Sequence, residues 1–391
     1  MFKIKKYNNI LQEKLNAMPK DLYEIGENLD NPDGILLRSF NLLDVELPEK
    51  LKAIARAGAG VNNIPIEKCS EKGIVVFNTP GANANAVKEL VLASLFLSSR
   101  KIYKGISWAK SLRGKGEEVP KLVEKGKSNF EGAEIKGKKL GIIGLGHIGV
   151  LVANDAAALG MEVIGYDPYI SVDAAWKLSQ NVKKETNLDH LLATADYITV
   201  HIPLTSNTKG MLNKEKFAIM KKGIKIINMA RGGLVVNSDL LEAIEDGIVS
   251  CYVTDFPEDE LLNNDNILTI PHLGASTPES EENCAAMAID ELKNFLEKGT
   301  IKNSVNFPDC ELSYSGTPRL LVANINVPNM VGQITTVLAE NNINIASMLN
   351  THKDKIGYNI IDIEEEVTEK VLEKIKKING VKMVRLIKLC C

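Results

Sequence analysis

Three glycines have the spacing of a phosphate-binding turn. The pattern is G-x-G-x-x-G, and it consists of Gly144-Leu145-Gly146-His147-Ile148-Gly149. The first glycine permits a tight turn, the second lets the backbone approach a pyrophosphate, and the third lets a helix pack closely on the preceding strand. An apolar stretch over 140–143 comes before this pattern, and an alanine-rich stretch follows it. This context predicts a dinucleotide-binding turn with a helix N-terminus facing the negative charge.

An acidic residue stands at the distance that such a turn requires. Asp167 ends the next predicted strand, 18 positions after Gly149. Its carboxylate would accept hydrogen bonds from the ribose hydroxyls and repel a 2′-phosphate. Neither Pro168 nor Tyr169 supplies a compensating positive charge. We therefore expect NAD rather than NADP, the alternative being a glycine turn with a helix-capping aspartate.

Two further side chains follow predicted strands and could do acid–base chemistry together. Arg231, in N-M-A-R-G-G, could grip a carboxylate with two parallel hydrogen bonds. His272, in P-H-L-G, follows an acidic run over 258–260. A carboxylate bonded to the far ring nitrogen fixes the imidazole tautomer, so the near nitrogen can exchange a proton with an alcohol. Taken singly, Arg231 could be a surface arginine and His272 a structural histidine.

The elements that must position these residues alternate between short buried strands and helices. We predict strands over 34–38, 51–57 and 74–78, a helix over 84–99, and a second series of strands over 140–143, 161–166, 197–201, 225–228 and 267–270. This alternation predicts an α/β fold with two doubly wound, Rossmann-like parallel-sheet domains. A long helix is expected over 276–297. The segment 111–138 is weakly patterned and is interpreted as a surface connection with one short helix.

The last part of the chain has a different order of elements. Strands over 320–327, 344–351, 358–363 and 381–389 and helices over 331–341 and 368–378 give the sequence βαββαβ. This order is that of the ferredoxin-like fold. A stretch with Pro308 and several small polar residues precedes it and suits a linker.

Composition excludes several classes of function. The chain of 391 residues has 47 basic and 50 acidic side chains and a formal net charge of -3. No basic stripe with interleaved aromatic residues indicates a nucleic-acid partner. No apolar run approaches the roughly 18 residues of a membrane span, and none follows the N-terminal lysines as in a signal peptide. The six cysteines lack metal-ligand spacing, so we expect reduced thiols in the cytoplasm and no metal site.

The motifs together resemble the D-isomer-specific 2-hydroxyacid dehydrogenase family. The similar segments are R-A-G-A-G-V-N over 56–62, N-T-P-G-A-N-A-N-A-V over 78–87, A-R-G-G from 230, D-F-P-E-D-E from 255 and P-H-L-G-A-S-T over 271–277. The terminal module resembles an ACT domain. The resemblance implies a substrate-binding domain over 1–95 and 276–305, an NAD-binding domain over 96–275, a linker over 306–317 and a regulatory ACT-like domain over 318–391.

The resemblance also implies roles for individual residues. His272 would be the general acid/base at a C2 hydroxyl, Glu260 its partner, and Arg231 the residue that holds carboxylate and carbonyl. The backbone of Ala59, Gly60 and Val61 would bind the substrate carboxylate, with Arg56 and Arg38 near a phosphate. The nicotinamide side of the cofactor would be lined by Pro203, Ala230, Asp255 and Gly274.

One departure from the family pattern leaves an assignment open. Asp255 is followed by Phe256 and Pro257, and no proline follows Glu260. Counting without a gap from Arg231 selects Glu260 as the partner of His272, whereas alignment on Phe256 selects Asp259. Glu260 is the preferred assignment.

The resemblance further implies an effector and an assembly. ACT-like domains pair edge to edge and bind an amino acid at the joint, here L-serine. Asn326 and Asn344 match positions that hold serine in family members, and Asn324 stands where some have histidine. The alternative is that these asparagines are turn and strand-end residues. A homodimer or homotetramer is expected.

The chemistry implied is NAD-dependent oxidation of D-3-phosphoglycerate at the entry to serine biosynthesis. Reduction of hydroxypyruvate, glyoxylate or another 2-oxo acid is one alternative. An NAD-sensing binding protein on the same scaffold is another.

Overall fold

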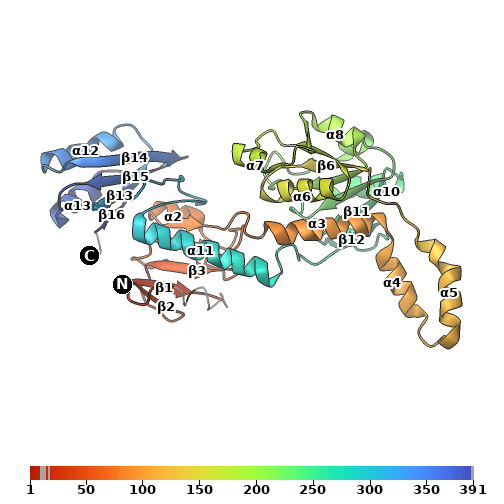
Figure 1. Cartoon of the computed structure of the whole chain (residues 1–391). Helices are drawn as coiled ribbons and strands as arrows, with labels where there is room; N and C mark the ends of the chain where they lie inside the picture. Colours follow the sequence, from red (N-terminus) through yellow and green to blue (C-terminus); the bar gives the residue numbers. More distant parts are fainter. Residues whose placement is uncertain (9–14, 16–17, 389–391) are drawn as a thin grey trace. The chain divides into compact units, whose positions relative to one another are not determined.

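The computed structural model describes residues 1–8, 15 and 18–388, and Leu389, the last residue of the expected terminal strand, lies outside them. The chain forms two compact units (Figure 1). One unit comprises residues 83–280, and the other comprises residues 1–82 together with 281–391. None of the helices in the described ranges has the length and apolar character needed to cross a bilayer.

The unit over 83–280 is built on a parallel sheet of seven strands in the order β12-β11-β10-β9-β6-β7-β8. The strands are β6 (Lys139–Ile143), β7 (Glu162–Tyr166), β8 (Lys183–Glu185), β9 (Tyr197–Val200), β10 (Ile224–Asn228), β11 (Val249–Thr254) and β12 (Ile267–Thr269). The doubly wound fold is thereby confirmed. The strands β8 and β11 were not predicted, because K-K-E has no apolar residue and V-S-C-Y-V-T is interrupted by polar ones.

Helices cover both faces of this sheet, which explains why its central strands are almost wholly apolar. On one face lie α3 (Ala84–Ser99), which matches the prediction, and α6 (His147–Ala158), with α7 (Val172–Lys177) beside them. On the other lie α8 (Leu188–Thr194), α9 (Lys214–Ala218) and α10 (Asn237–Glu245). The expected boundary at residue 95 placed most of α3 in the first domain, but its side chains Val87, Val91 and Leu95 pack in the core of this unit.

The segment 111–138 contains one short α-helix, as predicted. Helix α4 (Ile102–Ser111) ends where this segment begins, and α5 (Val119–Gly126) follows within it (Figure 1). The Trp108 ring packs on Phe130 with centroids 5.2 Å apart. A Cβ on Gly126 would lie 2.3 Å from the same indole, so the absence of a side chain permits the close packing of α4 and α5.

The other unit begins with a parallel sheet of five strands in the order β2-β1-β3-β4-β5. The strands are β1 (Phe2–Lys6), β2 (Tyr23–Gly26), β3 (Gly34–Leu37), β4 (Ala53–Arg56) and β5 (Val75–Phe77). Helix α2 (Ile66–Glu71) covers one face, and α11 (Pro278–Lys298), part of this unit from residue 281, covers the other. The strands β1 and β2 were not predicted, because lysine alternates with apolar residues in one and the other is only four residues long.

The same unit ends in an antiparallel sheet of four strands in the order β14-β15-β13-β16, which confirms the βαββαβ prediction. Its elements are β13 (Arg319–Ile325), α12 (Met330–Glu340), β14 (Ile345–Lys353), β15 (Ile356–Ile363), α13 (Glu369–Lys376) and β16 (Val381–Ile387). Helices α12 and α13 cover one face. The other face packs in one core with α11, through Leu321, Tyr358 and Phe295.

The expected linker over 306–317 is in part a packed segment. Phe307 and Cys310 are buried, and the backbone of Cys310 pairs with that of Ile301. The physical reason is that these apolar side chains fill the space between α11 and the terminal sheet.

Candidate active site

The glycine turn has the geometry that dinucleotide binding requires. Gly144 adopts φ +94°, and a Cβ there would lie 2.5 Å from the His201 carbonyl oxygen. A Cβ on Gly149 would lie 2.0 Å from the carbonyl oxygen of Gly144. Helix α6 can therefore pack closely on the turn only because residue 149 has no side chain. A Cβ on Gly146 would meet nothing within 4 Å. The second glycine thus leaves open space at the start of α6, where an anion can approach the backbone.

The residues that open α6 and end β7 lie beside this turn. His147 and Ile148 form the first turn of α6, and His147 is exposed. One Asp167 oxygen accepts a hydrogen bond from Leu145 N at 2.8 Å, and the other accepts one from Tyr169 N at 2.8 Å. Each oxygen keeps a second lone pair. The carboxylate therefore braces the turn and can still accept a hydrogen bond from a ribose hydroxyl.

The remaining predicted residues of this unit follow its parallel strands at their carboxyl ends. Pro203 follows β9, and Ala230 with Arg231 follows β10. Asp255 follows β11, and His272 with Gly274 follows β12. Carboxyl ends of parallel strands meet at one edge of a sheet, which is where open α/β sheets bind ligands.

A buried asparagine, which the sequence did not single out, shapes the turn that carries Arg231. The Asn228 side chain donates to the Arg231 carbonyl oxygen at 2.9 Å and accepts from Ala230 N at 3.1 Å. It also donates to the Tyr252 hydroxyl at 3.2 Å. Asn228 is therefore a positioning residue. Its place at the end of a buried strand, where a polar residue must find partners, was the available signal.

Asp255 is a buried carboxyl group with spare hydrogen-bonding capacity. Oδ2 accepts from Gly274 N at 3.3 Å, whereas Oδ1 has no hydrogen-bond partner among the residues that the structure describes. Burial raises the pKa of Asp255, and the positive charges of His272 and Arg231 act in the opposite direction. Those two side chains therefore lie within electrostatic reach of Asp255, and an amide donor on a bound nicotinamide would fit Oδ1.

In the structure, His272 and Glu260 contact different residues. The exposed His272 packs on Phe256 with ring centroids 4.8 Å apart. Glu260 accepts a hydrogen bond from Asn237 Nδ2 at 2.7 Å, and the same amide donates to Glu258 at 2.9 Å. No hydrogen bond joins His272 to Glu260 or Asp259 within the described ranges. The assignment of the partner carboxylate of His272 stays a prediction. Asn237, which the sequence did not single out, hydrogen-bonds to two carboxylates of the acidic run over 258–260.

In the other unit, the predicted substrate residues gather at the carboxyl ends of β3 and β4. Asn63 Nδ2 donates to the Arg38 carbonyl oxygen at 3.2 Å, and Arg56 Nε donates to Asn63 Oδ1 at 3.2 Å. Asn78 donates to the Ala59 carbonyl oxygen at 2.6 Å, which fixes the turn containing Gly60 and Val61. The Arg38 guanidinium forms an ion pair with Glu281 at 2.6 Å. Asn63 and Asn78 are thus supports that the sequence did not reveal.

One copy of the chain does not bring the three predicted serine-binding asparagines together. Asn326 follows β13 and donates its backbone N–H to the Lys355 carbonyl oxygen at 2.8 Å. Asn344 precedes β14 at the opposite end of the sheet, where its side chain donates to Glu364 at 2.6 Å. Asn324 is buried and bonded to Ile325 and Asn359. A site containing Asn326 and Asn344 would require two chains.

Within the described ranges, no group of three or more histidine, cysteine, aspartate or glutamate residues could hold a metal ion.

Sequence comparison identifies relatives of the chain. The profile of the D-isomer specific 2-hydroxyacid dehydrogenase NAD binding domain matches residues 92–275. The D-3-phosphoglycerate dehydrogenase of Methanocaldococcus jannaschii is 35% identical over 337 residues, which are 83% of this chain and 61% of that protein. The enzyme of the same name from Haemophilus influenzae is 32% identical over 386 residues, which are 93% of this chain and 88% of the relative. The chain thus spans about three fifths of the first relative's length and most of the second's.

Solved structures agree with these relatives. An NAD+-bound 3-phosphoglycerate dehydrogenase from Entamoeba histolytica has a TM-score of 0.60 at 27% identity and covers 78% of this chain and 98% of its own. A glyoxylate reductase from Paecilomyes thermophila has a TM-score of 0.64 at 24% identity, covers 78% of this chain and 98% of its own, and shows the shared fold alone. The cofactor is NAD. With a fitting glycine turn and relatives that match most of its length, the chain belongs to the D-isomer-specific 2-hydroxyacid dehydrogenase family.

Proposed function

We propose that the chain catalyses the NAD-dependent oxidation of D-3-phosphoglycerate to 3-phosphohydroxypyruvate, the first step of serine biosynthesis. The observation that carries the proposal is the joint placement of Arg231, Asp255 and His272 at the carboxyl edge of the sheet that bears the glycine turn. The names of the relatives support the choice of substrate. The basic residues Arg38 and Arg56 at the ends of β3 and β4 provide charges for a phosphate.

The proposed reaction assigns one task to each side chain. The His272 imidazole takes the proton of the C2 hydroxyl, while the hydride at C2 leaves with its electron pair and the carbonyl forms. Arg231 holds the substrate carboxylate by paired hydrogen bonds. When bound, the nicotinamide would supply the hydride acceptor, and Gly146, Asp167 and Asp255 would hold the cofactor. Glu260, or Asp259, would approach His272 when substrate is bound and would stabilise the imidazolium.

The decisive experiment combines a substrate comparison with a histidine substitution. D-3-phosphoglycerate should be oxidised with a higher kcat/KM than D-glycerate. His272→Ala should lower kcat at least about 100-fold, because general acid–base catalysis contributes roughly 10²- to 10⁴-fold. His190→Ala is the matched control, since His190 is exposed in the same unit and pairs with Glu185.

Each possible result has a clear meaning. A higher rate on glycerate or glyoxylate would favour the alternative, a 2-hydroxyacid reductase of different specificity. Unaltered turnover in His272→Ala would refute the assigned chemistry. Binding of NAD without turnover of any 2-hydroxy acid would favour an NAD-sensing protein.

We further propose that L-serine regulates the enzyme at a joint between two ACT-like modules. The exposed edge strand β14 and the separation of Asn326 from Asn344 within one chain support a site built from two copies in a homodimer or homotetramer. A rise in Tm with serine, but not with alanine or glycine, is the expected result.

We also propose a cytoplasmic location for the protein. The free thiols of Cys69, Cys284 and Cys310 support it, because thiols stay reduced in the cytoplasm.

A further inference from the structure

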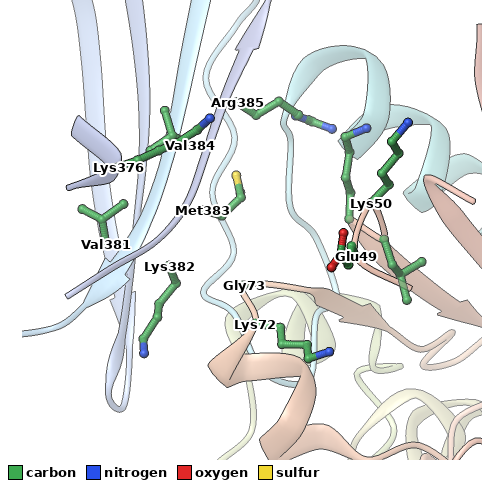
Figure 2. A pocket seen from close by; sticks show the side chains of 12 residues that line it. Glu49, Lys50, Lys72, Gly73, Lys376, Val381, Lys382, Met383, Val384 and Arg385 are labelled. Carbon is green, nitrogen blue, oxygen red and sulfur yellow. The ribbon is translucent and has the colours of Figure 1, made fainter. Parts of the chain in front are cut away.

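A basic pocket lies where the first sheet meets the terminal module, within one unit of the molecule. Its volume is about 480 Å³. One wall comes from residues 49–52 and from the turn at residues 72–73. The other comes from the end of α13 and from β16 (Figure 2). The space suits a small molecule rather than a single ion.

The charges lining this pocket are almost all positive. The basic side chains are Lys50, Lys52, Lys72, Lys376, Lys382 and Arg385, and Glu49 is the one lining carboxylate. Lys52 pairs with Asp33, and Lys376 pairs with Glu373 at 2.6 Å. The exposed Lys50 and Lys382 form no hydrogen bond or ion pair with the described residues. Low-dielectric walls around like charges concentrate a positive potential that attracts anions.

Arg385 supplies an independent sign of a missing ligand. Its Nη2 donates to the Phe295 carbonyl oxygen, and its guanidinium lies 4.5 Å from the centroid of the Phe295 ring. Its Nε and Nη1 are shielded from solvent and have no hydrogen-bond partner among the described residues. A buried donor without a partner costs about 1–3 kcal/mol, more when charged. Figure 2 shows the side chain extending from β16 toward the elements of the first sheet.

The two walls of the pocket touch directly beside it. Gly73 adopts φ +71°, and a Cβ there would lie 2.9 Å from the Met383 Cβ and 3.0 Å from the Lys382 carbonyl oxygen. The turn before β5 therefore packs on β16 through bare backbone. This contact places Lys72 and Lys382, the neighbours of Gly73 and Met383, on facing walls of one pocket.

The pocket is separate from the candidate substrate residues. Lys52 precedes β4, and Gly73 lies just before β5, so both stand at the amino ends of these strands. Arg56 and the turn at residues 59–61 stand at the carboxyl ends. The two groups lie at opposite edges of the same parallel sheet.

We propose that this pocket is a binding site for a small phosphorylated anion that joins the first sheet to the terminal module. Lysine acts as a point charge for phosphate, and arginine offers several N–H donors to its oxygens. Such a ligand neutralises Lys50 and Lys382, and its negative charge also interacts favourably with the Arg385 guanidinium in the pocket wall. It also stabilises the packing of β16 against the first sheet, because contacts to both walls are lost when the two separate.

The test uses pyrophosphate as the probe and the full chain as the protein. Isothermal titration calorimetry at constant ionic strength compares the wild type with Lys72→Gln/Lys382→Gln. The control is Lys68→Gln/Lys370→Gln, which removes two exposed lysines, from α2 and α13, outside the pocket. We expect at least about tenfold weaker binding at the pocket in the first variant. The control should stay within about twofold of the wild type.

Hydrogen exchange locates the binding. Pyrophosphate should slow exchange of the amides over 72–75 and 381–385 in the wild type and the control, but not in Lys72→Gln/Lys382→Gln. Equal binding by all three proteins would overturn the proposal. So would equal weakening in both double variants, or the same protection by sodium chloride at matched ionic strength. None of these readouts depends on turnover, so they stand apart from the test of the proposed reaction.

Discussion

Among the residues that the structure describes, two buried carboxyl groups, those of Asp255 and Glu291, have one oxygen without a hydrogen-bond partner. Their surroundings differ, and so do the consequences. Asp255 lies at the carboxyl edge of a sheet, where a bound cofactor can supply a donor. Glu291 lies on α11, where Oε1 accepts from Asn303 Nδ2 at 2.8 Å and Oε2 has no partner within the described residues. Burial, reinforced by the charges of Asp290 and Asp309, raises the pKa of Glu291 to about 8.

This raised pKa predicts a pH-dependent cost to stability. Below the pKa of the unfolded chain, near 4.5, Glu291 is protonated in both states and costs nothing. As the pH rises toward 8, unfolding increasingly releases a proton and stability falls. Glu291→Gln should therefore raise the free energy of unfolding by about 1–3 kcal/mol at pH 9 and change it little at pH 5.

Thermal unfolding at the two pH values measures this difference. Glu279→Gln, an exposed change on the same helix, should show no such dependence on pH. If Glu291→Gln behaved like Glu279→Gln, the carboxyl would be ionised without cost in the folded protein.

At the scale of elements, the three glycines of the turn between β6 and α6 have two different roles. Gly144 and Gly149 are required by the fold, since a Cβ at either would lie within 2.5 Å of a carbonyl oxygen. Gly146, with φ -75°, has a conformation open to any residue and space around it. Its role would be in binding alone.

Alanine substitutions should separate these two roles. Gly146→Ala should leave Tm nearly unchanged but weaken NAD binding about tenfold or more, because the methyl group occupies the space for the pyrophosphate. Gly144→Ala should lower the free energy of unfolding by about 1–3 kcal/mol, because alanine is strained at positive φ. Denaturant unfolding and NAD titration by fluorescence measure the two effects. A Gly146→Ala protein with the affinity of the wild type would show that the cofactor does not approach this backbone.

At the scale of the whole molecule, one ion pair supports the junction between the long helix and the terminal sheet. Arg319 and Asp362 face each other on β13 and β15, both fully buried, and form two hydrogen bonds. Arg319 also donates to the carbonyl oxygens of Lys298, Leu312 and Ser313. The guanidinium thus connects the end of α11, the segment before β13 and the sheet.

Removing one charge of this pair should destabilise the junction strongly. Asp362→Asn should lower the free energy of unfolding by about 3–5 kcal/mol, because it leaves a buried guanidinium without a counter-charge. Lys214→Gln, which breaks the exposed pair with Glu242, should cost less than about 1 kcal/mol. Urea unfolding followed by circular dichroism measures both. Equal effects of the two substitutions would mean that Arg319 is solvated in the folded protein.

Local patterns were sufficient to predict the glycine turn, the long helix over 84–99 and the βαββαβ order of the terminal module. These features follow from hydrophobic periodicity and from turn-forming residues that are close together in the sequence, so a short stretch of sequence is enough to predict them. The edge strand β8 and the lysine-bearing inner strand β1 were missed, because an exposed or alternating strand has no continuous apolar run.

Contacts between segments that are far apart in the sequence could not be predicted from such local patterns. The hydrogen bond from Asn228 to Tyr252, the burial of Phe307 and the pairing of Arg319 with Asp362 each depend on the chain folding back over many residues. The same is true of the basic pocket, whose lysines come from both ends of the chain. Side-chain type limits which partners are possible, but packing and the need to satisfy buried polar groups select among them.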